Sequence, residues 1–354
     1  MMVNSKFALA LRDALRYSTC GWLTLALIWS MPAAANFESG LSAYERGDYA
    51  AAMTRWMPLA KSGFAAAQHN IAVMFDHGHG VPPDDAVAIS WYKRAANGGH
   101  APSQHTLAML YSRGQGVAKD MQQAVAWYRK AGQQGHSESQ FILGVLYDFG
   151  KGVAKDERKA AVWYRKAAEQ GDARAQYNLA LMYDFGQGGL DNPLAAAEWY
   201  RHSAMQGNAK AQYMLGVAYL QGDGVEVNNA SSYAWMTLAA AAGHVRARQF
   251  RAHPWKKMDT AERKAGRALH LELRRRVRLR RSLSTETPAR LALPTTELIL
   301  DTQRVLVQKG LLASKPDGVL GPQTRAAIQQ LQKSLRLPQN GEPSAELLLL
   351  VDSD

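Results

Sequence analysis

The feature that most constrains the fold of this chain is a sequence repeat with a period of 36 residues. Glycines recur at this interval, and tryptophans keep the same interval at another phase. The glycines are Gly63, Gly99, Gly135, Gly171, Gly207 and Gly243, and the tryptophans are Trp91, Trp127, Trp163, Trp199 and Trp235. A period of this length is typical of solenoids, in which each unit buries its apolar face against its neighbours.

Each unit predicts a pair of helices. In residues 101–136, Gln104 and Leu107 belong to a set of residues at helical spacing. Gly114 can end this first helix, because glycine tolerates the left-handed backbone conformation. Asp120 can then cap the second helix, and its equivalents are also good capping residues: Asp84, Asp156, Asn192 and Asn228. Because one hairpin cannot bury both of its faces, the units are expected to stack into an all-α solenoid.

The repeated pattern resembles a known family. It reads A-x-x-Q-x-x-L-A-x-L-Y-x-x-G-x-G-V, followed by A-x-x-W-Y-R-K-A, and this resembles the SEL-one-like repeat, a relative of the tetratricopeptide repeat. The resemblance covers about residues 37–244, and we place the solenoid at residues 36–244. It implies a protein–protein adaptor rather than an enzyme, often in signalling or in the bacterial envelope.

A stripe beside the predicted core of the first helices, called here the first-helix stripe, is the candidate binding surface. By repeat it reads His69, Val73, Asp76; His105, Met109, Ser112; Phe141, Val145, Asp148; Tyr177, Leu181, Asp184; and Tyr213, Val217, Leu220. We expect it to line a concave face and to bind an unidentified protein partner with basic and apolar side chains. The residues proposed for this groove are Phe141, Asp148, Tyr177, Asp184 and Tyr213. The alternative is that the stripe packs against the adjacent repeat.

The N-terminus predicts export. Basic residues up to Arg16 precede an apolar run from Gly21 to Met31, and a row of small residues ends at Ala35. This arrangement is typical of a secretory signal peptide, here residues 1–35 with cleavage after Ala35. The alternative is an uncleaved membrane anchor, although the apolar run is shorter than the roughly 20 residues that span a bilayer.

Basic charge is concentrated after the last repeat. The chain has a formal net charge of +12, and the segment from Arg246 to Arg281 contains fourteen Lys and Arg against three acidic residues. Asp259 and Glu262 have capping-box spacing, and apolar residues follow at intervals of four: Ala261, Ala265, Leu269, Leu273 and Val277. We expect residues 245–296 to form a capping helix and a basic linker. The run Arg274–Arg281 is a candidate contact to an anionic lipid or wall polymer, and its alternative is a solvated helix end.

The last segment, residues 297–354, has a different pattern. Three short helices are expected, separated by turns at residues 317–321 and 337–341. The first turn resembles the bacterial peptidoglycan-binding module with the signature D-G-x-x-G-P-x-T. The resemblance implies that peptidoglycan is bound here, and the residues that carry it are Asp317, Gly318, Gly321, Thr324 and Arg325. Where members of the family often have aromatic rings, this chain has leucines such as Leu320.

The sequence contains no recognisable catalytic motif. A nucleophile elbow, a phosphate-binding loop and an H-E-x-x-H helix are all missing. The G-x-G pairs lie in hairpin loops and are interpreted as structural. Cys20 is the only cysteine and precedes the predicted cleavage site, so no disulfide or thiol nucleophile is expected in the mature chain. His77 and His79 lie in one loop, but no acidic or histidine cluster joins them in sequence, so neither a metal nor a cofactor is expected.

These observations predict a non-enzymatic periplasmic scaffold that binds a protein through its solenoid and peptidoglycan through its C-terminal domain. Nucleic acid is not an expected partner, because the chain is predicted to be exported and no aromatic residues interleave with its basic run. Two alternatives are a secreted or surface adaptor that binds a host or foreign protein, and an accessory protein of a cell-wall hydrolase.

Overall fold

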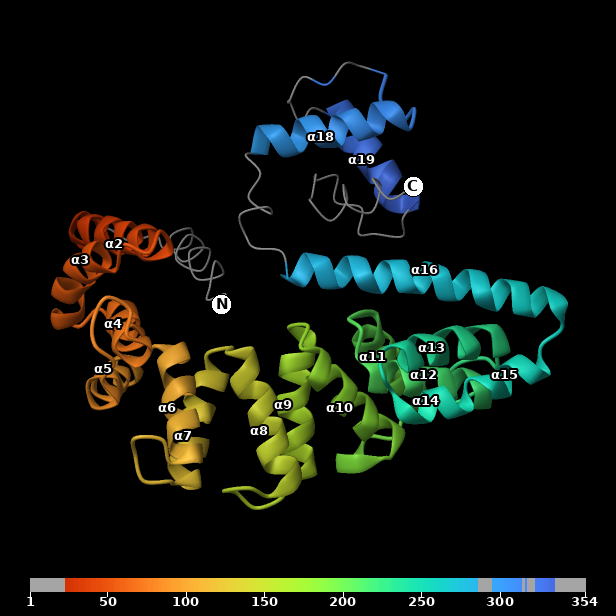
Figure 1. The fold of residues 1–354 in the computed structure, drawn as a ribbon, viewed down its shortest axis with the longest axis horizontal. Coiled ribbons are helices and arrows are strands. Elements are labelled where there is room, and N and C mark those ends of the chain that lie inside the picture. Colours follow the sequence, from red (N-terminus) through yellow and green to blue (C-terminus); the bar gives the residue numbers. More distant parts are fainter. Residues whose placement is uncertain (1–22, 286–294, 314–315, 317–321, 335–354) are drawn as a thin grey trace. The chain divides into compact units, whose positions relative to one another are not determined.

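The computed structural model describes residues 23–285, 295–313, 316 and 322–334, and these are helical without any strand (Figure 1). The chain divides into two units, one reaching His270 and the other beginning at Leu271. Within the described residues, no helix combines the length and the apolarity that crossing a bilayer requires. The predicted all-α architecture is confirmed.

Six helical hairpins follow one another in the first unit, coloured red to green in Figure 1. They are α2 (Leu23–Glu45) with α3 (Tyr49–Lys61), α4 (Ala65–His77) with α5 (Asp85–Asn97), α6 (Ala101–Arg113) with α7 (Met121–Gln133), α8 (Ser137–Phe149) with α9 (Glu157–Glu169), α10 (Ala173–Asp184) with α11 (Pro193–Met205), and α12 (Ala209–Gln221) with α13 (Asn229–Ala241). The last five hairpins are the five repeats that the glycine and tryptophan spacing predicted.

The predicted helix ends are confirmed. Each predicted capping residue, from Asp84 to Asn228, accepts a hydrogen bond from a backbone N–H in the first turn of its second helix. Gly114 ends α6 in the left-handed conformation, with φ 73°. The fourth repeat differs: α10 is one residue shorter than the other first helices, and a 3₁₀ turn, η1 (Gln187–Gly189), follows it. Its loop has Gly188 and Gly189 in succession, both with positive φ.

At the second glycine of each G-x-G pair, the loop of one hairpin contacts the preceding hairpin. Gly152 has φ 73°, and a Cβ at this position would lie 2.9 Å from both the Cβ and the carbonyl oxygen of Met121, the first residue of α7. The equivalent glycines Gly80, Gly188 and Gly224 approach the start of the preceding second helix in the same way, whereas Gly116 lies against the side chain of Ile89 inside α5. The G-x-G pairs are therefore structural, as expected: only glycine lets each loop dock on the hairpin before it.

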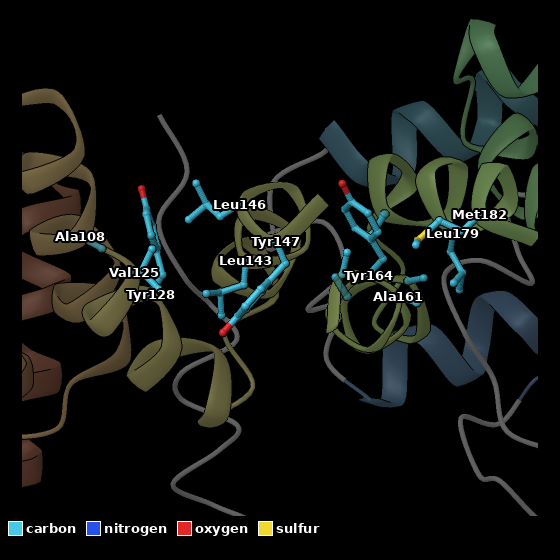
Figure 2. Packing of buried hydrophobic residues seen from close by; sticks show 14 of the residues in the cluster. Ala108, Val125, Tyr128, Leu143, Leu146, Tyr147, Ala161, Tyr164, Leu179 and Met182 are labelled. Atoms are coloured by element: carbon cyan, nitrogen blue, oxygen red, sulfur yellow. The ribbon is translucent and has the colours of Figure 1, made fainter. Parts of the chain in front are cut away.

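The core runs continuously between hairpins. Around α8 and α9, Leu143 and Tyr164 are fully buried, together with small residues such as Ala160. Figure 2 shows that the hydroxyls of Tyr128 and Tyr164 point one way and that of Tyr147 points the other way. The two kinds of tyrosine therefore mark two opposite faces of the solenoid.

A ladder of buried glutamines links the repeats. Gln104 Nε2 donates to the carbonyl oxygen of Ala96 at 3.0 Å, and Gln104 Oε1 accepts from Gln134 Nε2 at 2.7 Å. The same pairing recurs between Gln140 and Gln170 at 2.6 Å and between Gln176 and Gln206 at 2.8 Å. Because both ends of each amide are satisfied, these polar side chains can be buried at little cost. They also fix the register of one hairpin on the next.

The end of the first unit is partly as predicted. After α14 (Val245–Phe250) and α15 (Ala252–Lys257), the helix α16 (Thr260–Thr285) begins with the expected capping box, since Glu262 N donates to Asp259 Oδ1 at 2.8 Å and Asp259 N to Glu262 Oε2 at 2.9 Å. Its start packs on α13, because Gly266 approaches Ala230 and Tyr233.

The predicted apolar line along α16 is wrong in its first two members. Ala261 and Ala265 are exposed, Leu269 is half-buried, and Leu273 and Val277 are buried. An interval of four residues drifts across the helix surface, because a turn contains 3.6 residues. Gly266 takes the buried position at the start of the helix instead.

The second unit contains α18 (Thr295–Gln308) and α19 (Pro322–Ser334). Leu306 and Ile328 are fully buried between these helices, with Val305, Leu312, Ala327 and Leu331 around them. Gly310, at φ 70°, lies just after the end of α18. The third predicted helix, near residues 347–351, lies outside the described residues.

Candidate functional site

The rings of Phe141, Tyr177 and Tyr213 in the first-helix stripe are half-buried, and each contacts a side chain outside its own helix. The Phe141 ring lies 6.1 Å from that of Tyr164 on α9, and Tyr177 is at the same distance from Tyr200 on α11. Tyr213 stacks on His244, which precedes α14, at 4.5 Å. Part of each ring is thus used in packing and part is left accessible, and the role of the stripe in partner binding stays a prediction.

The aspartates of the stripe bind tyrosines of their own hairpin. Asp148 accepts a hydrogen bond from the Tyr164 hydroxyl at 3.3 Å, and Asp184 accepts one from the Tyr200 hydroxyl at 2.8 Å. Asp76 does the same for Tyr92 at 3.1 Å. Burial raises the pKa of Asp148, and the bond from Tyr164 opposes this shift. These carboxylates therefore have a structural role and also give the stripe an acidic edge.

The first two members of the stripe are histidines in matched clusters. His69 Nδ1 lies 2.8 Å from Ser103 Oγ, which also lies 2.9 Å from His100 Nδ1. One repeat later, His105, Ser139 and His136 have the same arrangement, with distances of 2.9 and 3.0 Å. Burial lowers the pKa of His69 to about 3 and that of His105 to about 4, so these rings are neutral at pH 7. The clusters connect neighbouring hairpins by hydrogen bonds.

One cation also lies on the stripe. The guanidinium carbon of Arg174 is 4.2 Å from the centre of the Phe141 ring, and Arg174 pairs with Asp172 at 2.6 Å and with Glu138 at 3.6 Å. Arg174 therefore covers one face of Phe141. Among the residues proposed for the groove, Tyr177 has no such covering cation in the described part of the chain. The sequence pattern does not reveal this difference, since position 174 varies between repeats.

The candidate wall-binding residues are only partly described. Thr324 lies in the first turn of α19, is 5% exposed, and its Oγ1 accepts a hydrogen bond from Gln303 Nε2 at 3.3 Å. Its hydroxyl thus holds α18 and α19 together. Arg325 is exposed. Asp317, Gly318 and Gly321 lie outside the described residues, so the role of the signature in binding stays a prediction.

The paired loop histidines have a packing role that the sequence did not reveal. His79 Nδ1 lies 2.6 Å from the Tyr44 hydroxyl, and its ring stacks on Tyr49 at 4.8 Å and 6°. His79 thereby attaches the N-terminal hairpin to the first repeat. The signal for this role is the pair Tyr44 and Tyr49, which the other repeats lack. Among the described residues, no three His, Cys, Asp or Glu side chains are grouped as a metal site would require.

The repeats match a known family model, and the boundaries of the matches agree with those of the repeats. The Sel1 repeat profile matches residues 65–100, 101–136, 137–172, 173–208 and 209–244. The chain belongs to the Sel1 repeat family. The five matches coincide with the hairpins from α4/α5 to α12/α13.

One solved structure supports the assignment, and a second is also similar to this chain. A Sel1 repeat protein from Oxalobacter formigenes is 34% identical over 60% of this Sel1 repeat chain and 87% of that chain, with a TM-score of 0.56. A protective antigen of uropathogenic Escherichia coli strains, which displays an SLR fold, is 28% identical over 94% of this chain and 80% of that chain, with a TM-score of 0.47. No curated protein matches the chain.

A second family match lies at the C-terminal end of this Sel1 repeat protein. The profile of the peptidoglycan binding domain matches residues 295–349, and α18 begins at the first of them. The predicted combination of a Sel1 solenoid with a peptidoglycan-binding region is confirmed. Both kinds of domain are typically non-catalytic, and the second is typical of proteins associated with the cell envelope.

Proposed function

We propose that this Sel1 repeat protein is a non-enzymatic periplasmic adaptor that holds a protein partner at the peptidoglycan. The observation that carries the proposal is the presence of both modules in one chain, a repeat solenoid at residues 65–244 and a peptidoglycan-binding region at residues 295–349. Sel1 repeats are built for protein interaction, and a wall-binding region fixes the place at which that interaction occurs.

The periplasmic location rests on the predicted signal peptide, residues 1–35. Residues 1–22 lie outside the described residues, and α2 runs through Ala35. Ala34, Ala35 and Asn36 are exposed, and the core of the first hairpin includes Phe37. Cleavage after Ala35 would therefore leave these core contacts intact.

The partner is proposed to bind the first-helix stripe through Phe141, Tyr177 and Tyr213, beside the carboxylates of Asp148 and Asp184. Half-buried rings offer rigid contact area, and the acidic edge favours a segment with Lys or Arg. The exposed arginines of α16 within Arg274–Arg281 are proposed as an additional contact to anionic polymer or lipid.

Co-sedimentation with purified peptidoglycan tests the wall-binding part. The chain from Asn36 to Asp354 is compared with a version that ends at Pro294, which keeps all described residues of the solenoid unit. The longer chain is expected to pellet with the wall more strongly than the shorter one. Equal pelleting of the two would refute wall binding by the C-terminal domain.

Peptide arrays test the partner surface. Extended peptides that carry basic and apolar residues are expected to bind the chain, and the double variant Asp148→Asn/Asp184→Asn is expected to bind them more weakly. Asparagine keeps an acceptor for the Tyr164 and Tyr200 hydroxyls, so the change removes charge and leaves the hairpins joined. Unchanged binding by this variant would exclude the acidic edge as part of the groove.

A further inference from the structure

The face formed by the second helices carries a row of cations that the proposed function does not use. The first three repeats each place two cationic residues directly after a Trp-Tyr pair, and the fourth places one there. This second-helix ladder consists of Lys93, Arg94, Arg129, Lys130, Arg165, Lys166 and Arg201, and all seven side chains are exposed. Because each pair occupies the same position in successive hairpins, the cations form one row along the solenoid.

Most side chains of the second-helix ladder contact uncharged groups, namely tyrosine hydroxyls and tryptophan rings. Nη2 of Arg129, Arg165 and Arg201 donates to the hydroxyl of a tyrosine in the next hairpin, at 2.9, 2.7 and 3.0 Å. The tyrosines are Tyr147, Tyr183 and Tyr219. The second cation of each of the first three pairs lies over the tryptophan three residues before it, at 3.9 to 4.7 Å. The charges are therefore oriented without being neutralised.

No carboxylate forms an ion pair with any of these seven cations in the described part of the chain. Residues 37–244 as a whole contain equal numbers of acidic and of Lys and Arg residues. Basic and acidic side chains lie on opposite faces. The Tyr147 hydroxyl accepts a hydrogen bond from Arg129, and the Tyr164 hydroxyl donates one to Asp148. These two hydroxyls point in opposite directions (Figure 2). One face of the solenoid has an acidic edge, and the opposite face is basic.

The composition of the ladder indicates the kind of ligand. The centres of protein–protein interfaces are depleted of charged residues as a class, although arginine is enriched there, whereas the ladder is a regular row of exposed charges that includes three lysines. Successive hairpins repeat these charges at regular intervals along the solenoid. Such a row fits a polymer with anionic groups along its length.

We propose that the second-helix ladder binds the carboxylates of peptidoglycan stem peptides, as a second contact to the polymer that the C-terminal domain recognises. This inference rests on the proposed wall-binding function. Two weak contacts on one polymer reinforce each other, because the first raises the effective concentration of the second. The ladder would also lay the solenoid along the wall and leave the first-helix stripe open to a partner.

The test uses the chain from Asn36 to Asp354 with four ladder residues neutralised: Arg129→Gln, Lys130→Gln, Arg165→Gln and Lys166→Gln. The matched control removes four exposed charges elsewhere on the solenoid: Lys61→Gln, Arg113→Gln, Lys119→Gln and Lys210→Gln. At about 50 mM salt, the ladder variant is expected to lose roughly tenfold in affinity for purified peptidoglycan, and the control much less. At about 500 mM salt, the difference between the two is expected to vanish because exposed charges are screened.

Chemical amidation of the wall carboxylates is an independent test of the proposal. Amidated peptidoglycan is expected to bind the unchanged chain and the ladder variant equally. Equal loss in the ladder variant and the control would overturn the proposal, as would preferential binding of single-stranded DNA over wall fragments at physiological salt. If the four-residue variant unfolds, the pair Lys130→Gln/Lys166→Gln, which leaves the Arg–Tyr bonds in place, is used instead.

The two proposals fail separately. If removal of residues 295–354 changes nothing while the ladder variant loses binding, the C-terminal module is not the wall contact and the ladder is. If the ladder variant binds like the control while the truncated chain loses binding, the ladder inference is wrong and the proposed function stands.

Discussion

At the scale of single residues, the glutamine ladder shows how a buried polar side chain can specify a stack of repeats. Gln104, Gln140 and Gln176 each have a donor and an acceptor partner, whereas Gln212 has only one. Gln212 is 2% exposed, and its Oε1 has no hydrogen-bond partner. The reason is that Ala242 occupies the position that holds a glutamine in the three preceding repeats.

Completing the glutamine ladder should stabilise the last repeat. Ala242→Gln supplies a donor to Gln212 Oε1, and we expect the free energy of unfolding to rise by about 1 kcal/mol. The reverse change, Gln134→Ala, removes the donor to Gln104 Oε1 and should cost about 1–3 kcal/mol. Urea unfolding followed by circular dichroism measures both. A lower stability for Ala242→Gln would show that the position has no room for the longer side chain.

The histidine clusters predict a dependence of stability on pH. Burial holds the folded pKa of His69 at about 3 and of His105 at about 4, below the ordinary value of 6.5. Between about pH 6.5 and 4 the unfolded chain therefore binds protons that the folded chain does not. This contribution to stability is complete above pH 6.5 and is lost as the pH falls toward 4. Nearby Glu138 opposes the shift of His105, and Arg113 and Arg174 reinforce it.

The double variant His69→Gln/His105→Gln isolates this effect, because glutamine forms hydrogen bonds and does not titrate. Between pH 7 and pH 4.5 the unchanged chain should lose roughly 5 kcal/mol more stability than the variant, about half of it from each histidine. Urea unfolding at both pH values gives the two differences. Parallel losses in the two proteins would show that other groups, such as the carboxylates, carry the whole pH dependence.

At the scale of elements, the hairpin loop joins neighbouring repeats as well as the two helices of one repeat. Gly135, which follows the second helix α7, has a positive φ and open space around its Cβ position. Gly152 has a positive φ and in addition lies against Met121. Two glycines with similar backbone conformations therefore differ in what a side chain would meet.

This difference can be measured with matched variants. Gly135→Ala should cost about 1 kcal/mol from backbone strain alone. Gly152→Ala should cost about 2–4 kcal/mol, because a Cβ there also collides with the start of α7. Thermal or urea unfolding of the two variants compares them directly. Equal costs would mean that the loop moves away from α7 without loss.

At the scale of the whole molecule, the first unit is organised so that its N-terminal segment is separable from the core. Phe37 contacts Phe64 at 5.2 Å, and its carbonyl accepts a hydrogen bond from the Trp56 indole at 3.1 Å. Ala34 and Ala35, just before it, are exposed. The predicted cleavage site thus lies just outside the first core contacts.

Removal of residues 1–35 should therefore leave the stability of the solenoid unchanged. We expect the unfolding midpoint of the chain from Asn36 to equal that of the whole chain within about 1 °C, since no described core residue is lost. The control Phe37→Ala should lower the midpoint clearly, because it removes a core ring. Differential scanning calorimetry measures all three. A marked drop on truncation would assign residues 1–35 a part in the fold.

Particular residues show what could be read from the sequence. The capping residues and the loop glycines were placed correctly, because their roles depend on neighbours within one repeat. The packing of His79 against Tyr44 and the cover of Phe141 by Arg174 were not, because these contacts join separate hairpins at positions that vary between repeats. The predicted line along α16 was wrong at Ala261 and Ala265 because the contacts of that helix come from α13.

The sequence by itself determined the repeat length, the helical hairpin, its caps and the order of the modules, since these follow from local backbone preferences and from periodic burial of apolar side chains. Only the tertiary structure determined which side chains contact each other between neighbouring repeats. The histidine clusters and the opposite charge of the two solenoid faces both depend on that stacking. The physical reason is that hydrogen bonds and ring contacts require atoms within a few ångströms, and residues about 18 to 36 positions apart reach that distance only when hairpins pack.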